Sequence, residues 1–259
     1  MRYAARVSYD GTDFAGYQVQ PGRRTVQAEL ETALTRLSGG GRVRVDAAGR
    51  TDAGVHATGQ VIAFSLSRRM PVRELARALD ALLPEDVAVH ALRRVEVGFH
   101  PRYAARYREY RYTVWNGPRE PLRERTALGV RIPLDDTAMA EAAQALVGRH
   151  DFSAYGGSDR QPIRTLVGIR VRRRGRTITI DVVGEAFLRQ MVRSIVAALL
   201  RVGRGEATRD DVAAALGSPG RAFAGAVAPA KGLCLRRVVL GRPTATRNGD
   251  DDNEDLHTA

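Results

Sequence analysis

The sequence predicts an α+β protein made of two βαββαβ units whose sheets are mainly antiparallel. Two observations predict this class. Runs in which apolar and polar residues alternate, as in a half-buried strand, are interspersed with runs in which apolar residues recur every three or four positions, as on one face of a helix. The same order of runs occurs twice, which is typical of the split βαβ unit. A chain of 259 residues, 44% of them hydrophobic, is long enough to bury a proper core.

The first unit is expected in residues 1–104. Its elements are a strand, a helix that Thr25 caps, two strands, a helix that begins at Pro71, and a strand. Glycines and prolines punctuate these elements and mark the turns between them. The elements are expected at residues 2–9, 26–37, 42–48, 58–65, 71–83 and 87–95.

The second unit is expected in residues 105–242, after a division near 96–104. It repeats the order and adds a short helix, at which Thr208 and Asp211 resemble a capping box. The strongest helix has an apolar stripe from Leu188 to Leu199. The elements are expected at residues 105–114, 136–147, 164–172, 176–183, 188–202, 209 onward and 233–240. Residues 243–259 are polar and acidic and are expected to form a disordered tail.

The charge of the chain favours a polyanionic partner. Lys and Arg number 41 against 29 Asp and Glu, so the net charge is +12, and five of the acids stand in the last ten residues. All of the cations except Lys231 are arginines, a ratio that GC-rich codon usage explains better than a preference for phosphate does. The excess of positive charge still indicates a partner such as nucleic acid.

Composition also excludes several classes of protein. The single cysteine, Cys234, rules out an intramolecular disulfide and a Cys-rich zinc site, and with it the zinc-dependent base deaminases. The N-terminus has no apolar stretch of signal-peptide length, and the longest apolar run, 195–200, is far too short for a membrane span. A cytoplasmic protein is therefore expected. The phosphate-binding glycine motifs are absent, so no nucleotide or flavin cofactor is indicated.

The most unusual stretch is the loop at residues 48–57. It joins two expected strands and carries Arg50 and Asp52, which would point the same way in an extended chain. An arginine beside an aspartate keeps the carboxylate ionised and directs it. An aspartate among glycines is more often a turn residue, and His56 is better explained as a structural hydrogen-bonding group than as a base. No metal site is evident, because no second acid or histidine lies nearby at ligand spacing.

Two other stretches suggest RNA binding. Residues 107–112 interleave tyrosines with arginines on an expected strand, which places Arg108, Tyr110 and Tyr112 on one face. Such faces stack unpaired bases, although tyrosines that pack on a core give the same pattern. On the expected helix, Arg189 and Arg193 are one turn apart; a solvated helix face explains them at least as well as a cleft.

Taken in order, these segments resemble the TruA family of tRNA pseudouridine synthases over roughly residues 1–241. Any one of them is weak, but their order and spacing together are specific. They are SYDGT (8–12), TVQ (25–27), GRTDAGVHA (49–57), YRY (110–112), HDF (150–152), FLRQMVR (187–193) and APAKGL (228–233).

The resemblance implies a function, a fold and a set of site residues. The function is conversion of uridine to pseudouridine at positions 38, 39 and 40 of the tRNA anticodon arm. The fold is two RRM-like, ferredoxin-like domains that flank a deep basic central cleft, in a homodimer without a cofactor or metal. The catalytic aspartate falls on Asp52, its adjoining arginine on Arg50, the active-site tyrosine on Tyr110 and a further arginine on Arg193.

The chemistry leaves alternatives open. Asp52 could act on C1′ or C6 of the nucleotide or remove a sugar proton, and Tyr110 could stack on the uracil or take the C5 proton. The candidates for contacts to the RNA backbone are Arg23, Arg24, Arg189 and Arg221.

Three other functions were weighed against this one. A non-catalytic RNA-binding protein on the same fold fits the charge and the Tyr–Arg strand, but gains nothing from the Arg50–Asp52 loop. A hydrolase that releases a base or sugar generally needs a second carboxylate, and none stands out beside Asp52. A uridine methyltransferase often needs a catalytic cysteine, whereas Cys234 is expected in a strand, in the core.

Overall fold

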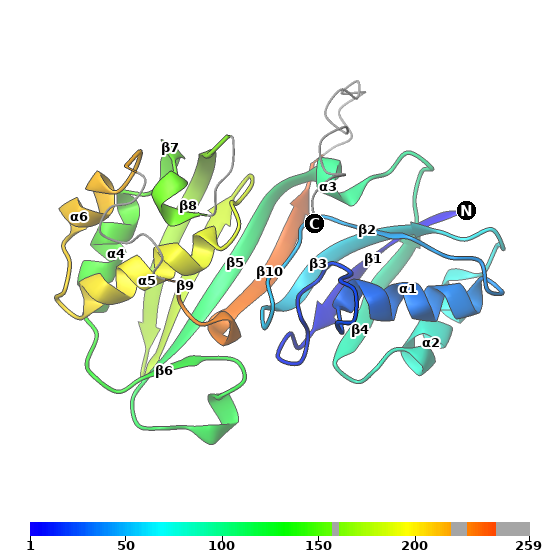
Figure 1. Cartoon of the computed structure of the whole chain (residues 1–259), viewed down its shortest axis with the longest axis horizontal. Helices are drawn as coiled ribbons and strands as arrows, with labels where there is room; N and C mark the ends of the chain where they lie inside the picture. The colour runs from blue at the N-terminus through cyan, green and yellow to red at the C-terminus, as the bar shows by residue number, and fades with distance from the viewer. Residues whose placement is uncertain (157–160, 219–226, 242–259) are drawn as a thin grey trace.

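A computed structural model describes residues 1–156, 161–218 and 227–241 of the chain. It is a mixed α+β fold built on one ten-stranded sheet (Figure 1). The strand order is β4-β1-β3-β10-β5-β9-β8-β7, with β2 paired to β3 and β6 paired to β5. Most neighbours are antiparallel; β10 with β3 and β5 with β6 are parallel pairs. The prediction of an α+β class with mainly antiparallel pairing is confirmed.

The first half of the chain follows the predicted order closely. Its helices are α1 (Val26–Leu37) and α2 (Val72–Leu82), and Thr25 caps α1 by accepting from the Ala28 N–H at 3.4 Å. The strand expected at 42–48 is shorter, because the Val43 N–H donates to a side chain of α1 instead of to a strand. The strands are β1 (Arg2–Tyr9), β2 (Val45–Ala47), β3 (His56–Ser65) and β4 (Val87–Arg94).

The rest of the chain contains short elements that local periodicity did not predict, namely α3 at the end of the first unit and, in the second unit, β6, β7 and three 3₁₀ turns. The helices are α3 (Pro101–Ala104), α4 (Asp136–Gln144), α5 (Met191–Gly203) and α6 (Arg209–Ala214), and the turns are Pro121–Arg123, Ser153–Tyr155 and Ala230–Gly232. The strands are β5 (Ala105–Asn116), β6 (Leu128–Val130), β7 (Gly148–Asp151), β8 (Ile163–Arg174), β9 (Thr177–Gly184) and β10 (Leu233–Leu240).

One helix boundary corrects a prediction that bears on the site. The helix expected at 188–202 begins at Met191, because Gln190 before it adopts a left-handed conformation with φ 62°. Arg189 therefore precedes the helix, and the expectation that Arg189 and Arg193 share a helical face is wrong. The capping box of Thr208 and Asp211 is present at α6, as predicted.

The strand β10 joins the two halves of the chain in a single sheet, a joint that the sequence pattern did not predict. It pairs with β5 from Leu233 to Leu240, whereas its parallel contact with β3 consists of Cys234 opposite His56 and Leu235 opposite Ala57. This pairing also explains why β3 begins at His56, earlier than predicted.

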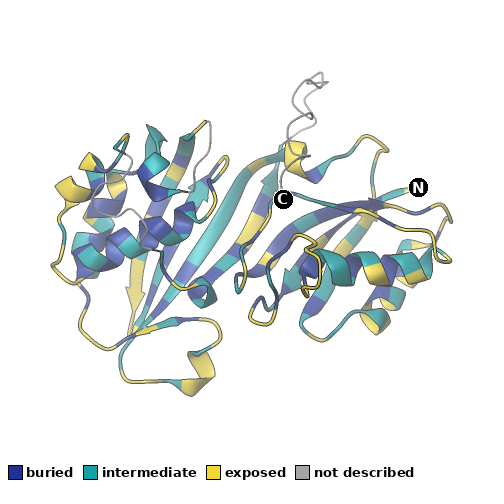
Figure 2. Ribbon diagram, in the orientation of Figure 1, coloured by how far each residue is buried: buried dark blue, intermediate teal, exposed yellow. Residues whose placement is uncertain are grey.

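Two hydrophobic cores lie along this sheet, one for each half. Figure 2 shows buried residues in both helix–sheet layers. One core is formed mainly by residues before position 90 and the other mainly by residues after 110. Leu235 and Val238 of β10 pack in the first core and Leu233 in the second, and Tyr110 packs against both. The junction of the two cores is therefore at β5 and β10.

Candidate active site

The loop that carries Asp52 is fixed to the surrounding structure at both of its sides. The buried side chain of Gln60 donates to the Gly49 carbonyl at 2.7 Å. The Thr51 hydroxyl lies 2.8 Å from the Tyr9 hydroxyl in a buried hydrogen bond, and the Thr51 carbonyl accepts from the Tyr17 N–H at 3.0 Å. A loop held in this way keeps its side chains in one position, as a catalytic group requires.

Asp52 itself begins a tight turn that only small residues allow. Its carbonyl accepts from the Val55 N–H at 3.2 Å, and Gly54 within the turn has φ +75°, a conformation that side chains disfavour. The turn lies directly against Gly11, where an added Cβ would come within 2.1 Å of the Val55 carbonyl oxygen. The SYDGT and GRTDAGVHA segments, distant in sequence, are thus in contact.

Arg193 places a positive charge beside Asp52 from the other half of the chain. Its Nη1 lies 3.4 Å from Oδ2 of Asp52, and its Nε donates to the Ala228 carbonyl at 2.7 Å. The side chains of Arg193 and Asp52 are 15% and 29% exposed, so the pair is sheltered but open to a ligand. Within the described ranges, Oδ1 of Asp52 accepts no hydrogen bond and is available for a substrate.

Tyr110 lies near this pair at the junction of the two cores. Its ring meets Phe187 edge-on with the centroids 5.1 Å apart. Burial raises the pKa of the Tyr110 phenol to about 12, the Arg108 guanidinium opposes that rise, and the Asp52 carboxylate adds to it. The phenol is therefore protonated at neutral pH. Tyr112, by contrast, is fully buried and donates to the Pro229 carbonyl at 2.8 Å, so it belongs to the core.

His56 connects three segments around the loop. Its Nδ1 lies 3.0 Å from the Gly11 N–H, which donates to it, and 3.1 Å from Oδ1 of Asp10, while its Nε2 lies 3.1 Å from the Lys231 carbonyl. These contacts fit the structural role expected of it. In the part of the chain that the structure describes, no three His, Cys, Asp or Glu side chains group as a metal site.

The other predicted site residue, Arg50, is not brought to the carboxylate. It is exposed and, among the described residues, forms no ion pair with Asp52. Among the described residues, the guanidinium beside Asp52 is that of Arg193.

The predicted RNA-binding arginines differ in their surroundings. Arg23 and Arg189 are exposed, and Arg221 lies outside the described residues. Arg24 is engaged within the protein: it pairs with Asp86 at 2.7 Å and with Glu29 at 2.9 Å. A guanidinium that already holds two carboxylates is a weaker candidate for a phosphate contact.

Sequence reasoning missed two neighbours of Tyr110. Phe187 appeared only as the first letter of a motif, and Arg108 only as a member of an alternating strand. The signal for Arg108 was the face that it shares with Tyr110, but its partners are backbone carbonyls distant in sequence.

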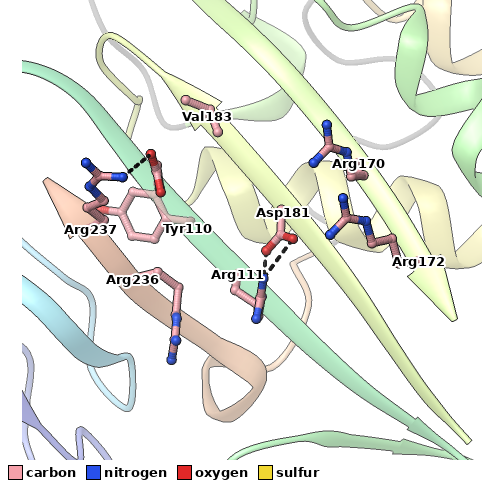
Figure 3. Close-up of a pocket in the computed structure, with 9 residues that line it drawn as sticks. Tyr110, Arg111, Arg170, Arg172, Asp181, Val183, Arg236 and Arg237 are labelled. Carbon is pink, nitrogen blue, oxygen red and sulfur yellow. Dashed lines mark hydrogen bonds and ion pairs between the residues drawn. The ribbon is translucent and has the colours of Figure 1, made fainter. Parts of the chain in front are cut away.

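A cavity of about 470 Å³ lies on the face of the sheet to which Arg111 and Asp181 point, and Tyr110 is also among its lining residues (Figure 3). Strand alternation points Glu109 and Arg111 of β5 into it, away from the helices and from the buried neighbours of Tyr110. Arg111 and Asp181 form a two-contact ion pair there, at 2.6 and 3.0 Å. Cys234 is half-buried on this face and opposite Arg111, so the expectation that it lies in the core is wrong.

A comparison with models of known protein families shows to which family the chain belongs. A family model described as tRNA pseudouridine synthase matches residues 5–104 and 142–239. The chain belongs to the tRNA pseudouridine synthase family. No described helix of this synthase is both long enough and apolar enough to cross a membrane.

Curated proteins named tRNA pseudouridine synthase A are similar over most of their length. The one from Shouchella clausii is 44% identical over 93% of this chain and 94% of its own. The one from Pelobacter propionicus is 44% identical over 90% and 96%, and the one from Myxococcus xanthus is 42% identical over 98% of each. Relatives of one name thus match 90–98% of this chain.

Proposed function

We propose that this chain isomerises uridine to pseudouridine in tRNA, at positions 38, 39 and 40 of the anticodon arm, with Asp52 as the catalytic carboxylate. The observation that carries the proposal is the Asp52–Arg193 pair, which the two halves of the chain form beside Tyr110. Membership of the tRNA pseudouridine synthase family supports the reaction, and the net charge of +12 supports an RNA substrate.

The proposed reaction needs a catalytic carboxylate but no second substrate. The N1–C1′ bond breaks, the base turns, and C5 joins C1′, so substrate and product contain the same atoms and no group donor or oxidant is consumed. Asp52 has three routes to this result: attack at C1′, attack at C6, or removal of a sugar proton to give a glycal. Oδ1, which accepts no hydrogen bond from the described residues, serves each of them, and Arg193 holds the other oxygen.

Tyr110 supports the reaction as a stacking surface. The target uridine must leave its base stack, which costs a few kcal/mol that stacking and phosphate contacts offset. An aromatic ring beside Asp52 stacks on the extracted uracil. Because the pKa of the phenol is about 12, Tyr110 takes the C5 proton only after it has given up its own.

Further parts of the proposal concern the assembly. We propose two domains, 1–104 and 105–242, each RRM-like and together flanking a basic cleft. The separate hydrophobic cores support this division, as do the strand orders β4-β1-β3 and β10-β5-β9-β8. Family resemblance supports a cytoplasmic homodimer that binds the tRNA anticodon arm without a cofactor.

Pseudouridine formation in unmodified transcripts tests the function. Transcripts with uridine at 38, 39 or 40 are incubated with the wild type and with Asp52→Ala, and the product is mapped by position. We expect product at these positions from the wild type alone, with tRNA affinity of the variant within a few fold. Tight binding without product from either protein indicates a non-catalytic RNA-binding protein instead.

A further inference from the structure

Arg108 has an unusual set of partners for an arginine near a catalytic site. Its guanidinium donates to the Ala48 carbonyl through Nη2 at 2.8 Å and through Nε at 3.3 Å, to the Arg102 carbonyl at 3.1 Å, and to the Glu185 carbonyl. Among the described residues no carboxylate pairs with it. Burial lowers the pKa of the Arg108 guanidinium, which shows that its environment disfavours the charge.

The carbonyls that Arg108 holds belong to the segments that build the site. Ala48 begins the loop that carries Asp52. Glu185 follows β9 and leads through Phe187, which contacts Tyr110, to the helix that carries Arg193. Arg108 itself stands on β5 two positions before Tyr110, on the same face. One side chain therefore contacts both the start of the loop that carries Asp52 and the segment that leads to Phe187 and Arg193.

The chemistry of these contacts requires a guanidinium. The Nη1 of Arg108 also donates to the Ala105 carbonyl at 3.5 Å, which makes four carbonyls in all. Carbonyls that approach from different segments need donors that point in different directions, and the planar guanidinium offers five N–H groups in a fixed geometry. A lysine ammonium keeps the charge but concentrates its donors on one atom, so it cannot reach all of these carbonyls at once.

We propose that Arg108 is a positioning residue of the active site, whose guanidinium fixes the Asp52 loop relative to the segment that leads to Arg193. The proposal rests on the proposed function. Asp52 and Arg193 are joined by a single contact of 3.4 Å, so the geometry of this pair depends on how the Asp52 loop is held in place. A shift of the loop by about 1 Å lowers a catalytic rate by roughly 10²-fold while leaving remote binding contacts intact.

The test compares Arg108→Lys with Arg111→Lys, its neighbour on the same strand but on the opposite face. The single-turnover rate of pseudouridine formation at saturating tRNA, the tRNA dissociation constant and the melting temperature are measured for each. We expect Arg108→Lys to lose roughly 10²-fold in rate, with affinity within a few fold and a melting temperature close to that of the wild type. The control is expected to keep the wild-type rate.

A second variant separates positioning from charge and from stability. In Arg108→Ala, added guanidinium at millimolar concentration is expected to restore part of the rate, whereas ammonium at equal ionic strength is not. A wild-type rate in Arg108→Lys overturns the proposal, and so does a rate loss that matches the unfolded fraction. Absence of product from the wild type overturns the proposed function instead.

Discussion

Two arginine–aspartate pairs lie on opposite faces of the same sheet, and they are built differently. On the face of the sheet that bears the cavity of Figure 3, here called the outer face, Arg111 contacts both oxygens of Asp181, at 2.6 and 3.0 Å. The two residues stand directly opposite each other on β5 and β9. On the other face, Arg193 reaches one oxygen of Asp52 at 3.4 Å and directs its Nε to a backbone carbonyl.

The difference shows which pair is suited to chemistry. In the outer pair both carboxylate oxygens are occupied by the guanidinium, which leaves little for a ligand to engage. In the Asp52 pair one oxygen has no hydrogen-bond partner among the described residues, and the two residues are 141 positions apart in the chain. A closed pair between neighbouring strands links the two strands, whereas an open pair assembled from two halves of a chain has the geometry that the proposed role of Asp52 requires.

The largest effect is expected for Asp52→Asn, and the matched change Asp181→Asn serves as its control. Asp52→Asn removes the carboxylate and should lower the single-turnover rate by about 10³-fold or more, because an amide is neither a nucleophile nor a base. Asp181→Asn should leave the rate within a few fold of the wild type. Rapid-quench assays on a tRNA transcript measure both; equal losses in the two variants would contradict the assignment of roles.

The next largest effect is expected for Tyr110→Phe. The ring still stacks, so affinity should change little, while loss of the hydroxyl should lower the rate by roughly 10²-fold. Because the pKa of the phenol is about 12, the wild-type rate should show no ionisation of this group up to about pH 10. A wild-type rate that rises with pH in this range, and does not do so in the variant, would show that a phenolate acts.

A smaller effect is expected for Arg193→Lys. The charge remains, but one ammonium cannot bond both Asp52 and the Ala228 carbonyl in the fixed geometry that the guanidinium provides. The rate should fall by about tenfold or more. Arg111→Lys is the matched change in the closed pair, and its rate should stay at the wild-type level. A fall of the same size in Arg111→Lys would mean that the two faces are coupled.

The smallest effect is expected for the stability of the protein in acid, through Asp10 at the edge of the proposed site. Burial raises the pKa of Asp10, but hydrogen bonds from Thr12 and Arg125 outweigh it and hold that pKa below its ordinary value of 3.8. A lowered folded pKa stabilises the protein above the unfolded pKa, and this stability is lost as the pH falls through the folded value.

Arg125→Ala removes one of these stabilising contacts. The midpoint of acid unfolding, followed by circular dichroism, should move to higher pH by roughly a few tenths of a unit, because the pair is largely exposed. A shift to lower pH would show that Asp10 is not stabilised in its charged form by Arg125.

Local pattern predicted the long elements well, because their periodicity is set by burial of one face. It did not predict the start of α5, which depends on the backbone conformation of Gln190. Nor did it place β10 between β3 and β5, since that position depends on pairing between distant residues. Asp52 stood out by its loop and Arg193 was named by family resemblance, but their pairing depends on contact between distant segments, which spacing does not reveal.

The contacts around Arg108 had no signal in the sequence. They are made to carbonyl oxygens, which every residue has, so no residue type reveals them. Hydrogen bonds of this kind become visible only in a folded structure.

The central position of β10 has a consequence for biosynthesis. The ribosome delivers the chain from the N-terminus, and domains generally fold as they emerge. The loop that carries Asp52 and the strand that carries Tyr110 are made early, but the strand that lies between β3 and β5 emerges only when residues 233–240 have been translated. A nascent chain can therefore fold most of its first core, but it gains Leu235 and Val238 of that core, and the strand that joins the two parts of the proposed site, only after residues 233–240 have been made.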